Sequence, residues 1–139
     1  MSKPGEKTNS KRREPPPEKL GSAFTDILAQ ATRKTRGVVG AVFLDDEGEP
    51  IDEYGLGSDL DLQITGAHMG LILEKLAKRL SRGSFGRLAY FTLECEQRQL
   101  LAHRVADTYV VVFVVEPQVP LDKAIVQLLH TANALERAI

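Results

Sequence analysis

The stretch GVVGAVFLDDEGEPIDEYG, residues 37–55, decides the fold. Residues 38–44 are almost continuously apolar and rich in valine, and they are too few for a helix between Gly37 and an acidic turn, so they predict a buried strand. Asp46-Glu47-Gly48 predicts a hairpin turn, because glycine readily takes a positive φ. Residues 50–56 then predict a second, more polar strand near an edge of the sheet.

The four acidic residues of this stretch, Asp45, Asp46, Glu47 and Glu49, either bind a cation or only turn the chain. They alternate with Gly48 and lack further oxygen ligands at the spacing of a calcium loop. We interpret them as a solvated hairpin turn.

The remaining elements follow from apolar periodicity and from residues that start or stop helices. They are helices at 22–36, 59–82 and from Pro120 onward, and strands at 85–94, 97–105 and 109–115. The two strands of the second hairpin are joined by a tight turn at Cys95-Glu96, and 109–115, the most apolar run, is expected at the sheet centre. The pattern predicts an α/β (α+β) sandwich of order αββαβββα. Its five-stranded, mainly antiparallel sheet has one long helix on one face and two helices on the other.

Composition predicts a soluble, cytoplasmic protein. The chain has 139 residues, of which 42% are hydrophobic and 27% charged, with a net charge of −1. No apolar run approaches the roughly 20 residues that span a bilayer, and the charged N-terminus lacks the apolar stretch of a signal peptide. The single cysteine, Cys95, cannot form an internal disulfide. We interpret it as a structural thiol.

Residues 1–20 differ from the rest and are predicted to be a disordered, basic, proline-rich tail, with one folded domain at 21–139. The tail holds four of the seven prolines and almost no large apolar side chain before Leu20, so it cannot bury enough surface to offset its ordering entropy. Lys11-Arg12-Arg13 either contacts nucleic acid or anionic lipid, or is solvated. Three basic residues among prolines favour the solvated reading, and we expect no nucleic-acid partner.

The long middle helix has two apolar faces. Met69, Ile72, Leu73, Leu76 and Leu80 fall on one side, which we assign to the sheet. Leu60, Ile64, Ala67 and Leu71 fall in a narrow arc on the opposite side. A helix that covers one sheet needs one apolar stripe, so the second predicts a subunit or partner interface. The alternative is that loops or a crossing helix bury it within the monomer.

The usual anchors of enzymatic chemistry are missing from the sequence. It contains no G-x-G-x-x-G, G-x-x-x-x-G-K-[ST], H-E-x-x-H or G-x-S-x-G. Three different predicted elements carry the histidines, His68, His103 and His130, which disfavours a joint metal site. Glu94 and Glu96 flank a turn, which disfavours an acid/base pair. Arg79, Arg82 and Arg87 form either an anion site or a charged helix end that complements the helix dipole, and the second reading is favoured. We expect no catalytic residue, metal, cofactor or small-molecule substrate, and therefore no enzyme.

With this element order, GVVGAVFLDDEGEPIDEYG before a long helix, and LECEQRQLLAHRVADTYVVVFVV before a final amphipathic helix, resemble the roadblock (dynein light-chain) family over about residues 22–139. The resemblance implies a non-enzymatic homodimer or heterodimer that pairs edge strands and middle helices. Bacterial members typically regulate Ras-like small GTPases, by stimulating hydrolysis or by scaffolding. The resemblance thus implies a homodimer that binds a small GTPase, with residues 85–94 as the dimerising edge strand.

The expected dimer and partner surface combines the second stripe with that edge strand. Its residues are Leu60, Ile64, Ala67, His68, Leu71, Phe85, Arg87, Ala89 and Phe91. Two alternatives stay open at this point. One is a structural dimerisation subunit of a motor, polarity or signalling complex with no GTPase partner. The other is a small-molecule-sensing domain, which the lack of convergent polar groups in the predicted core disfavours.

Overall fold

A computed structural model describes residues 22–57 and 59–139. The elements are α1 (Ala23–Lys34), β1 (Val38–Asp45), β2 (Pro50–Gly55), α2 (Asp59–Leu80), β3 (Tyr90–Glu94), β4 (Gln99–Val105), β5 (Tyr109–Val115) and α3 (Leu121–Ala138). The strands form one sheet in the order β2-β1-β5-β4-β3, and every neighbouring pair is antiparallel. This order places β5 at the centre and leaves β2 and β3 at the two edges.

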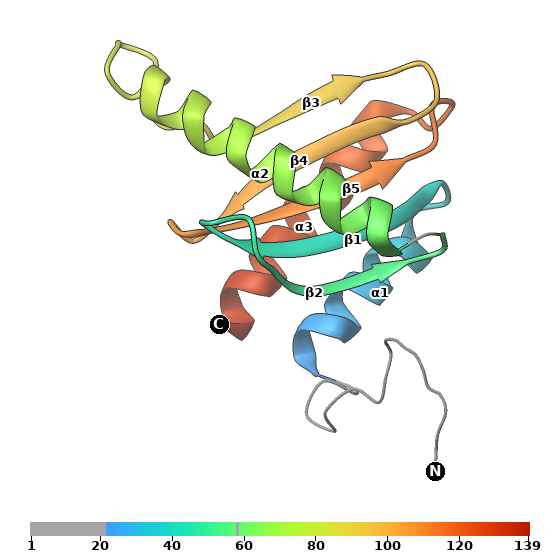
Figure 1. The fold of residues 1–139 in the computed structure, drawn as a ribbon. Helices are drawn as coiled ribbons and strands as arrows, with labels where there is room; N and C mark the ends of the chain where they lie inside the picture. The colour runs from blue at the N-terminus through green and yellow to red at the C-terminus, as the bar shows by residue number, and fades with distance from the viewer. Residues whose placement is uncertain (1–21, 58) are drawn as a thin grey trace.

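The sheet is covered on both faces (Figure 1). The long helix α2 crosses one face diagonally, and α1 and α3 lie together on the other. Two apolar cores result. Phe43 and Phe113 point toward α1 and α3, whereas Val42 and Val112 point toward α2. Alternate residues of the same strands serve opposite cores, which explains why β1 and β5 are apolar at nearly every position.

The predicted α+β sandwich and the order of its elements are confirmed. Local signals account for most boundaries. Ser22 caps α1 by accepting the Thr25 backbone N–H at 3.1 Å, and Pro120 precedes the first turn of α3. Gly37, which separates α1 from β1, takes a φ of +95° that favours glycine. The predicted tail at 1–20 lies outside the described residues.

The predicted strand 85–94 was too long, because β3 begins only at Tyr90. In the β3–β4 register Tyr90 pairs with His103, so residues before Leu88 would need partners beyond Val105, where β4 ends. There Ala106 adopts a φ of +53° as the chain turns. Gly86 likewise takes a φ of +83°, which an extended strand does not accommodate.

Other boundaries shift by a few residues. The first helix ends at Lys34 rather than 36, α2 ends at Leu80 rather than 82, and β4 starts at Gln99 rather than 97. The second hairpin turns at Glu96 and Gln97, since the Cys95 N–H donates to the Arg98 carbonyl at 2.9 Å. The predicted turn at Cys95-Glu96 was therefore one residue early.

The predicted sheet-facing side of α2 was partly wrong. Met69 and Leu73 are buried as expected, but Ile72 and Leu76 are exposed. The physical reason is that α2 lies on the sheet through its smallest residues. A Cβ on Gly66 would come within 2.4 Å of a Val42 methyl. This close approach rotates the helix so that Leu62, Gly66, Met69, Leu73 and Ala77 face inward.

Candidate interaction surface

The side of α2 that points away from the sheet carries four large, exposed apolar side chains, which we call the outer face of α2. Their exposed fractions are 49% for Ile64, 45% for Leu71, 41% for Ile72 and 40% for Leu76. The exposed His68 lies between the first two of these along the helix. Apolar side chains grouped on one helix face are typical of a protein-binding surface. The second stripe predicted from sequence is therefore not covered at Ile64 and Leu71 by the rest of the chain that the structure describes.

Two other residues predicted for this stripe are placed differently. Ala67 is half-buried, because the β1–β2 turn packs beside it: a Cβ on Gly48 would lie 3.7 Å from the Ala67 Cβ. Leu60 is in α2, but its side chain lies outside the part that the structure describes. The turn thus covers the stripe at Ala67, and the outer face extends instead toward Ile72 and Leu76.

The acidic hairpin is held by hydrogen bonds from its backbone to the Asp45 side chain. One Asp45 carboxylate oxygen accepts the N–H groups of Glu47 and Glu49, each at 2.9 Å. Asp46, Glu47 and Glu49 are exposed. Between residues 22 and 139, with 58 left aside, no group of three or more His, Cys, Asp or Glu side chains is arranged to hold a metal ion. The carboxylate of Asp45 therefore organises the turn.

Charge is distributed unevenly along α2. The N-terminal end carries Asp59 and Asp61, and the acidic turn lies beside the middle of the helix. The C-terminal part carries Lys75, Lys78 and Arg79, all exposed. Acidic residues near a helix N-terminus and basic residues near its C-terminus complement the helix dipole. The outer face is therefore apolar in the middle, acidic at one end and basic at the other.

The edge strand β3 has one side free of strand partners in the described chain. The Ala89 carbonyl and the Cys95 N–H both bond to the neighbouring β4 segment, at 2.9 Å each. Backbone groups alternate in direction along an antiparallel strand, so the N–H and C=O groups of Tyr90, Thr92 and Glu94 point outward. An open edge of this kind is a template for pairing with another strand.

The other predicted interface residues surround the start of β3. Phe85 is 79% exposed in the loop after α2, and Arg87 forms an exposed ion pair with Asp107. Ala89 is exposed as well. Phe91, in contrast, is half-buried and packs against the core under α2. The structure thus brings Ile64, His68 and Leu71 together on α2, places Phe85 and Arg87 beyond its C-terminal end, and turns Phe91 inward.

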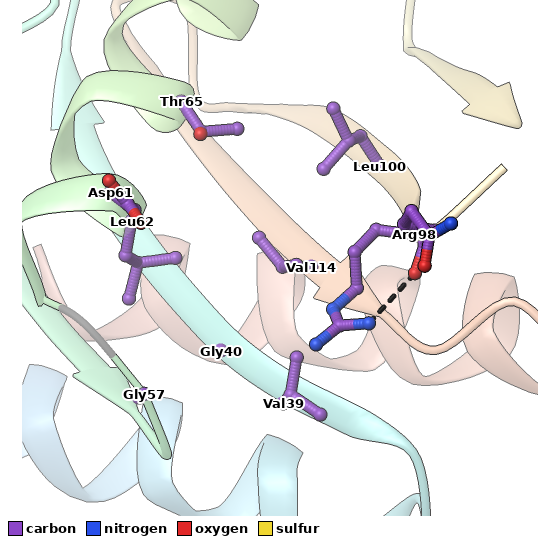
Figure 2. Close-up of a pocket in the computed structure, with 11 residues that line it drawn as sticks. Val39, Gly40, Gly57, Asp61, Leu62, Thr65, Arg98, Leu100 and Val114 are labelled. Atoms are coloured by element: carbon purple, nitrogen blue, oxygen red, sulfur yellow. Dashed lines mark hydrogen bonds between the residues drawn. The ribbon is translucent and has the colours of Figure 1, made fainter. Parts of the chain in front are cut away.

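Sequence reasoning missed a groove of about 520 Å³ at the corner of the sheet (Figure 2). Its floor is Val39, Gly40, Leu100 and Val114, from three neighbouring strands, and one wall is the N-terminal part of α2 with Asp61, Leu62 and Thr65. Figure 2 shows the Arg98 side chain extending over the floor toward Val114 and Val39. The guanidinium of Arg98 donates to the Gln97 carbonyl at 2.8 Å. We call this the corner groove.

The three histidines lie on α2, β4 and α3. His103 is half-buried and stacks on the Tyr90 ring, with centroids 5.8 Å apart and planes 3° from parallel. Burial lowers the pKa of His103 from its usual 6.5, and the bond between its ring nitrogen and the Arg104 carbonyl acts in the opposite direction. His68 and His130 are exposed on helices that cover opposite faces of the sheet. The sheet therefore separates these two imidazoles.

The architecture and the two-sided helix define a Roadblock/LC7 fold. The Roadblock/LC7 domain from Streptomyces avermitilis superposes with a TM-score of 0.73 at 11% identity, covering 81% of this chain and 94% of that one. Myxococcus xanthus MglB gives a TM-score of 0.75 at 11% identity, covering 84% and 94%. MglB in a tetrameric arrangement gives 0.69 at 21% identity, covering 85% and 90%. At these identities the similarity establishes the fold.

Comparisons of sequence alone add nothing to this assignment: no protein-family model matches the chain, and no curated protein matches it. Among the helices of residues 22–57 and 59–139, none combines the length and apolar character that a membrane crossing requires.

Proposed function

We propose that this protein is a non-catalytic, dimeric regulator or adaptor of a Ras-like small GTPase in the cytoplasm. The observation that carries the proposal is the outer face of α2, with Ile64 and Leu71 exposed on a helix that already covers the sheet with its other side. The Roadblock/LC7 fold supports it, because the sequence resembles a family whose bacterial members regulate such GTPases. The surface offers apolar contact and charge rather than a set of convergent catalytic groups.

Dimerisation is supported by the open edge of β3. An antiparallel pairing of β3 with a second copy is centred on Thr92 if all five residues take part, so that Tyr90 lies opposite Glu94 of the other copy. The outward-pointing groups of Tyr90, Thr92 and Glu94 are those that this register uses. The two sheets then form one continuous sheet with both α2 helices on the same face.

Charge along α2 supports the same arrangement. A twofold axis at Thr92 runs the two α2 helices in opposite directions. The basic end of each helix, with Lys78 and Arg79, then lies toward the acidic end of the other, with Asp61. Complementary charge of this kind favours the antiparallel pairing over a parallel one.

Such a dimer acts on a GTPase without supplying chemistry if it binds one nucleotide state better than the other. A surface that orders the switch loops shifts the population toward the ordered state by as much as its affinities for the two states differ. An adaptor that only places the GTPase needs no such difference. The two modes are therefore distinguished by comparing the two nucleotide states.

The dimer is tested with Thr92→Pro. Proline removes an N–H that points away from β4, so the fold is retained, while pairing with the second copy loses a hydrogen bond and is blocked sterically. Light scattering is expected to report a dimer for the wild type and a monomer for the variant. Circular dichroism should be unchanged. A variant as dimeric as the wild type would refute this mode of assembly.

GTPase binding is tested with the Ras-like GTPases of the source organism, each loaded with GDP or a non-hydrolysable GTP analogue. Binding to the full-length chain is measured by calorimetry, and hydrolysis by phosphate release. Ile64→Asp and Leu71→Asp are expected to reduce GTPase binding. Val126→Asp, at an exposed position on α3, is the matched control. If no GTPase binds in either state, the proposal is wrong.

A structural dimerisation subunit without a GTPase partner uses the same outer face of α2. Affinity purification of the full chain separates the two functions, because a scaffold recovers complex subunits and no GTPase. Loss of those subunits from the Leu71→Asp variant would then favour this alternative.

A further inference from the structure

Phe85 is the most exposed large apolar side chain in the described part of the molecule. It lies in the loop between α2 and β3, with Gly83 and Gly86 on either side. In Figure 1 this loop projects from the corner where the C-terminal end of α2 meets the start of β3. An aromatic ring held in water at the tip of a loop loses a large hydrophobic stabilisation that a protein contact would recover.

The corner groove lies at the opposite end of the sheet, beside the β3–β4 turn. Val114 pairs with Gly40 on one side and Leu100 on the other, and Leu100 pairs with Leu93 of β3. These four residues form a row across the sheet on the α2 side. Because α2 runs diagonally, it leaves this end of the row open. Leu93 remains 39% exposed, so an apolar strip leads from the β3 edge into the corner groove.

The register of the proposed dimer brings these two features together. When Thr92 pairs with Thr92 of the second copy, Tyr90 of the second copy lies beside Glu94 of the first. The residues that precede Tyr90 in the second copy then continue past Glu94, alongside the β3–β4 turn. That turn contains Gln97 and Arg98, which line the corner groove. Phe85 follows α2 directly, so it approaches on the face of the sheet that carries the groove.

Charge favours the same contact. The segment between Glu74 and Glu94 contains five basic residues and no acidic one. The corner groove is lined by the acidic Asp61 and the basic Arg98, and the exposed Glu96 lies in the β3–β4 turn beside it. Arg82, next to Gly83, is exposed. Attraction of the basic loop to Asp61 and Glu96 steers the loop toward the groove.

We propose that Phe85 of each copy docks in the corner groove of the other copy, which gives the dimer two reciprocal aromatic anchors. This inference rests on the proposed dimer through β3. It assigns the groove to a second copy of this chain, and it explains why a loop outside the strand carries an exposed phenylalanine. A buried aromatic anchor surrounded by polar contacts is typical of residues that dominate binding energy.

Proximity is tested by cross-linking full-length protein in which Cys95, the only cysteine, is replaced by serine. One preparation carries Phe85→Cys and the other Gln97→Cys, and one of them bears a size tag. A short bismaleimide is expected to join the two only after the preparations are mixed. Cross-linking within the Phe85→Cys preparation alone, or none in the mixture, would contradict the docked arrangement.

Energetics are tested with Phe85→Ser, which is expected to raise the dimer dissociation constant by about tenfold or more. Val126→Ser, an exposed apolar position on α3, is the matched control and should leave it unchanged. Thr92→Pro distinguishes a failure of the Phe85 anchor from a failure of the β3 dimer. If Thr92→Pro dissociates the dimer and Phe85→Ser does not weaken it, the anchor is wrong and the β3 dimer stands. If Thr92→Pro also has no effect, both are wrong.

Discussion

At the scale of single residues, Asp52 joins the start of α1 to the edge strand β2. Its carboxylate is buried and accepts the hydroxyls of Ser22, at 3.1 Å, and Thr25. Its other oxygen accepts the Glu53 N–H at 2.8 Å. The sequence marks Asp52 only as a polar residue in a half-polar strand, and nothing local indicates that it meets the cap of a helix 30 residues earlier.

Replacing Asp52 by alanine removes the shared acceptor of two hydroxyl groups. We expect the free energy of unfolding to fall by about 1.5–3 kcal/mol, the usual range for hydrogen bonds to a charged group. Urea denaturation measures this. Asp46→Ala, in the exposed hairpin turn, is the control and should change stability by less than about 0.5 kcal/mol. Equal effects of the two substitutions would show that the Asp52 network does not stabilise the fold.

His103 is expected to make stability depend on pH. Its folded pKa lies below that of the unfolded chain because burial disfavours the charged ring. The unfolded chain therefore binds the proton more readily, and the stabilisation by neutral His103 is complete above about pH 6.5. It is lost as pH falls through the folded pKa. Thermal melting of wild type should decline more steeply between pH 7 and pH 5 than that of His103→Gln, and parallel curves would contradict this assignment.

At the scale of elements, the contact between α2 and β1 depends on glycine at one position and not at the next. Gly66→Ala places a methyl 2.4 Å from a methyl of buried Val42, which is β-branched and has little freedom to move. Gly70→Ala meets only Leu44, at 3.6 Å, an ordinary contact. The two substitutions have the same helix propensity, so they separate packing from propensity.

We expect Gly66→Ala to destabilise the protein by about 1–3 kcal/mol through overpacking. Gly70→Ala should stabilise it by up to about 1 kcal/mol, because alanine is the better helix former. Chemical denaturation of both variants checks the opposite signs. If Gly66→Ala were also stabilising, the close approach of α2 to the sheet would be wrong.

At the scale of the whole molecule, the predicted pairing of α2 helices implies a dimer that weakens in salt. The acidic and basic ends of α2 are solvent-exposed where they are described, and exposed charges are screened at high ionic strength. At about 1 M salt the Debye length is only about 3 Å. Analytical ultracentrifugation should show a larger dissociation constant at 1 M than at low salt. A dimer that tightens with salt would indicate that apolar contact alone holds it.

The candidate surface was only partly predictable from sequence. Ile64 and Leu71 were identified from their residue type and spacing, and Phe85 from the resemblance to the roadblock family, and each is exposed. Phe91 shares their chemistry but packs inward, because the register with β4 sets which face of β3 it occupies. The corner groove gave no sequence signal, since it arises from the diagonal path of a helix across strands that are distant in the chain.

By itself the sequence determined the kinds of element, their order and the sheet hairpins, because apolar periodicity, glycine turns and helix caps act within a few residues. Tertiary structure decided where β3 begins, which side chains of α2 face outward, and where the open groove lies. These properties depend on partners distant in sequence. The start of β3 is limited by the end of its neighbour β4 at Val105 and by the positive φ of Gly86. A helix rotates to the face that allows the closest approach, which glycine provides at position 66.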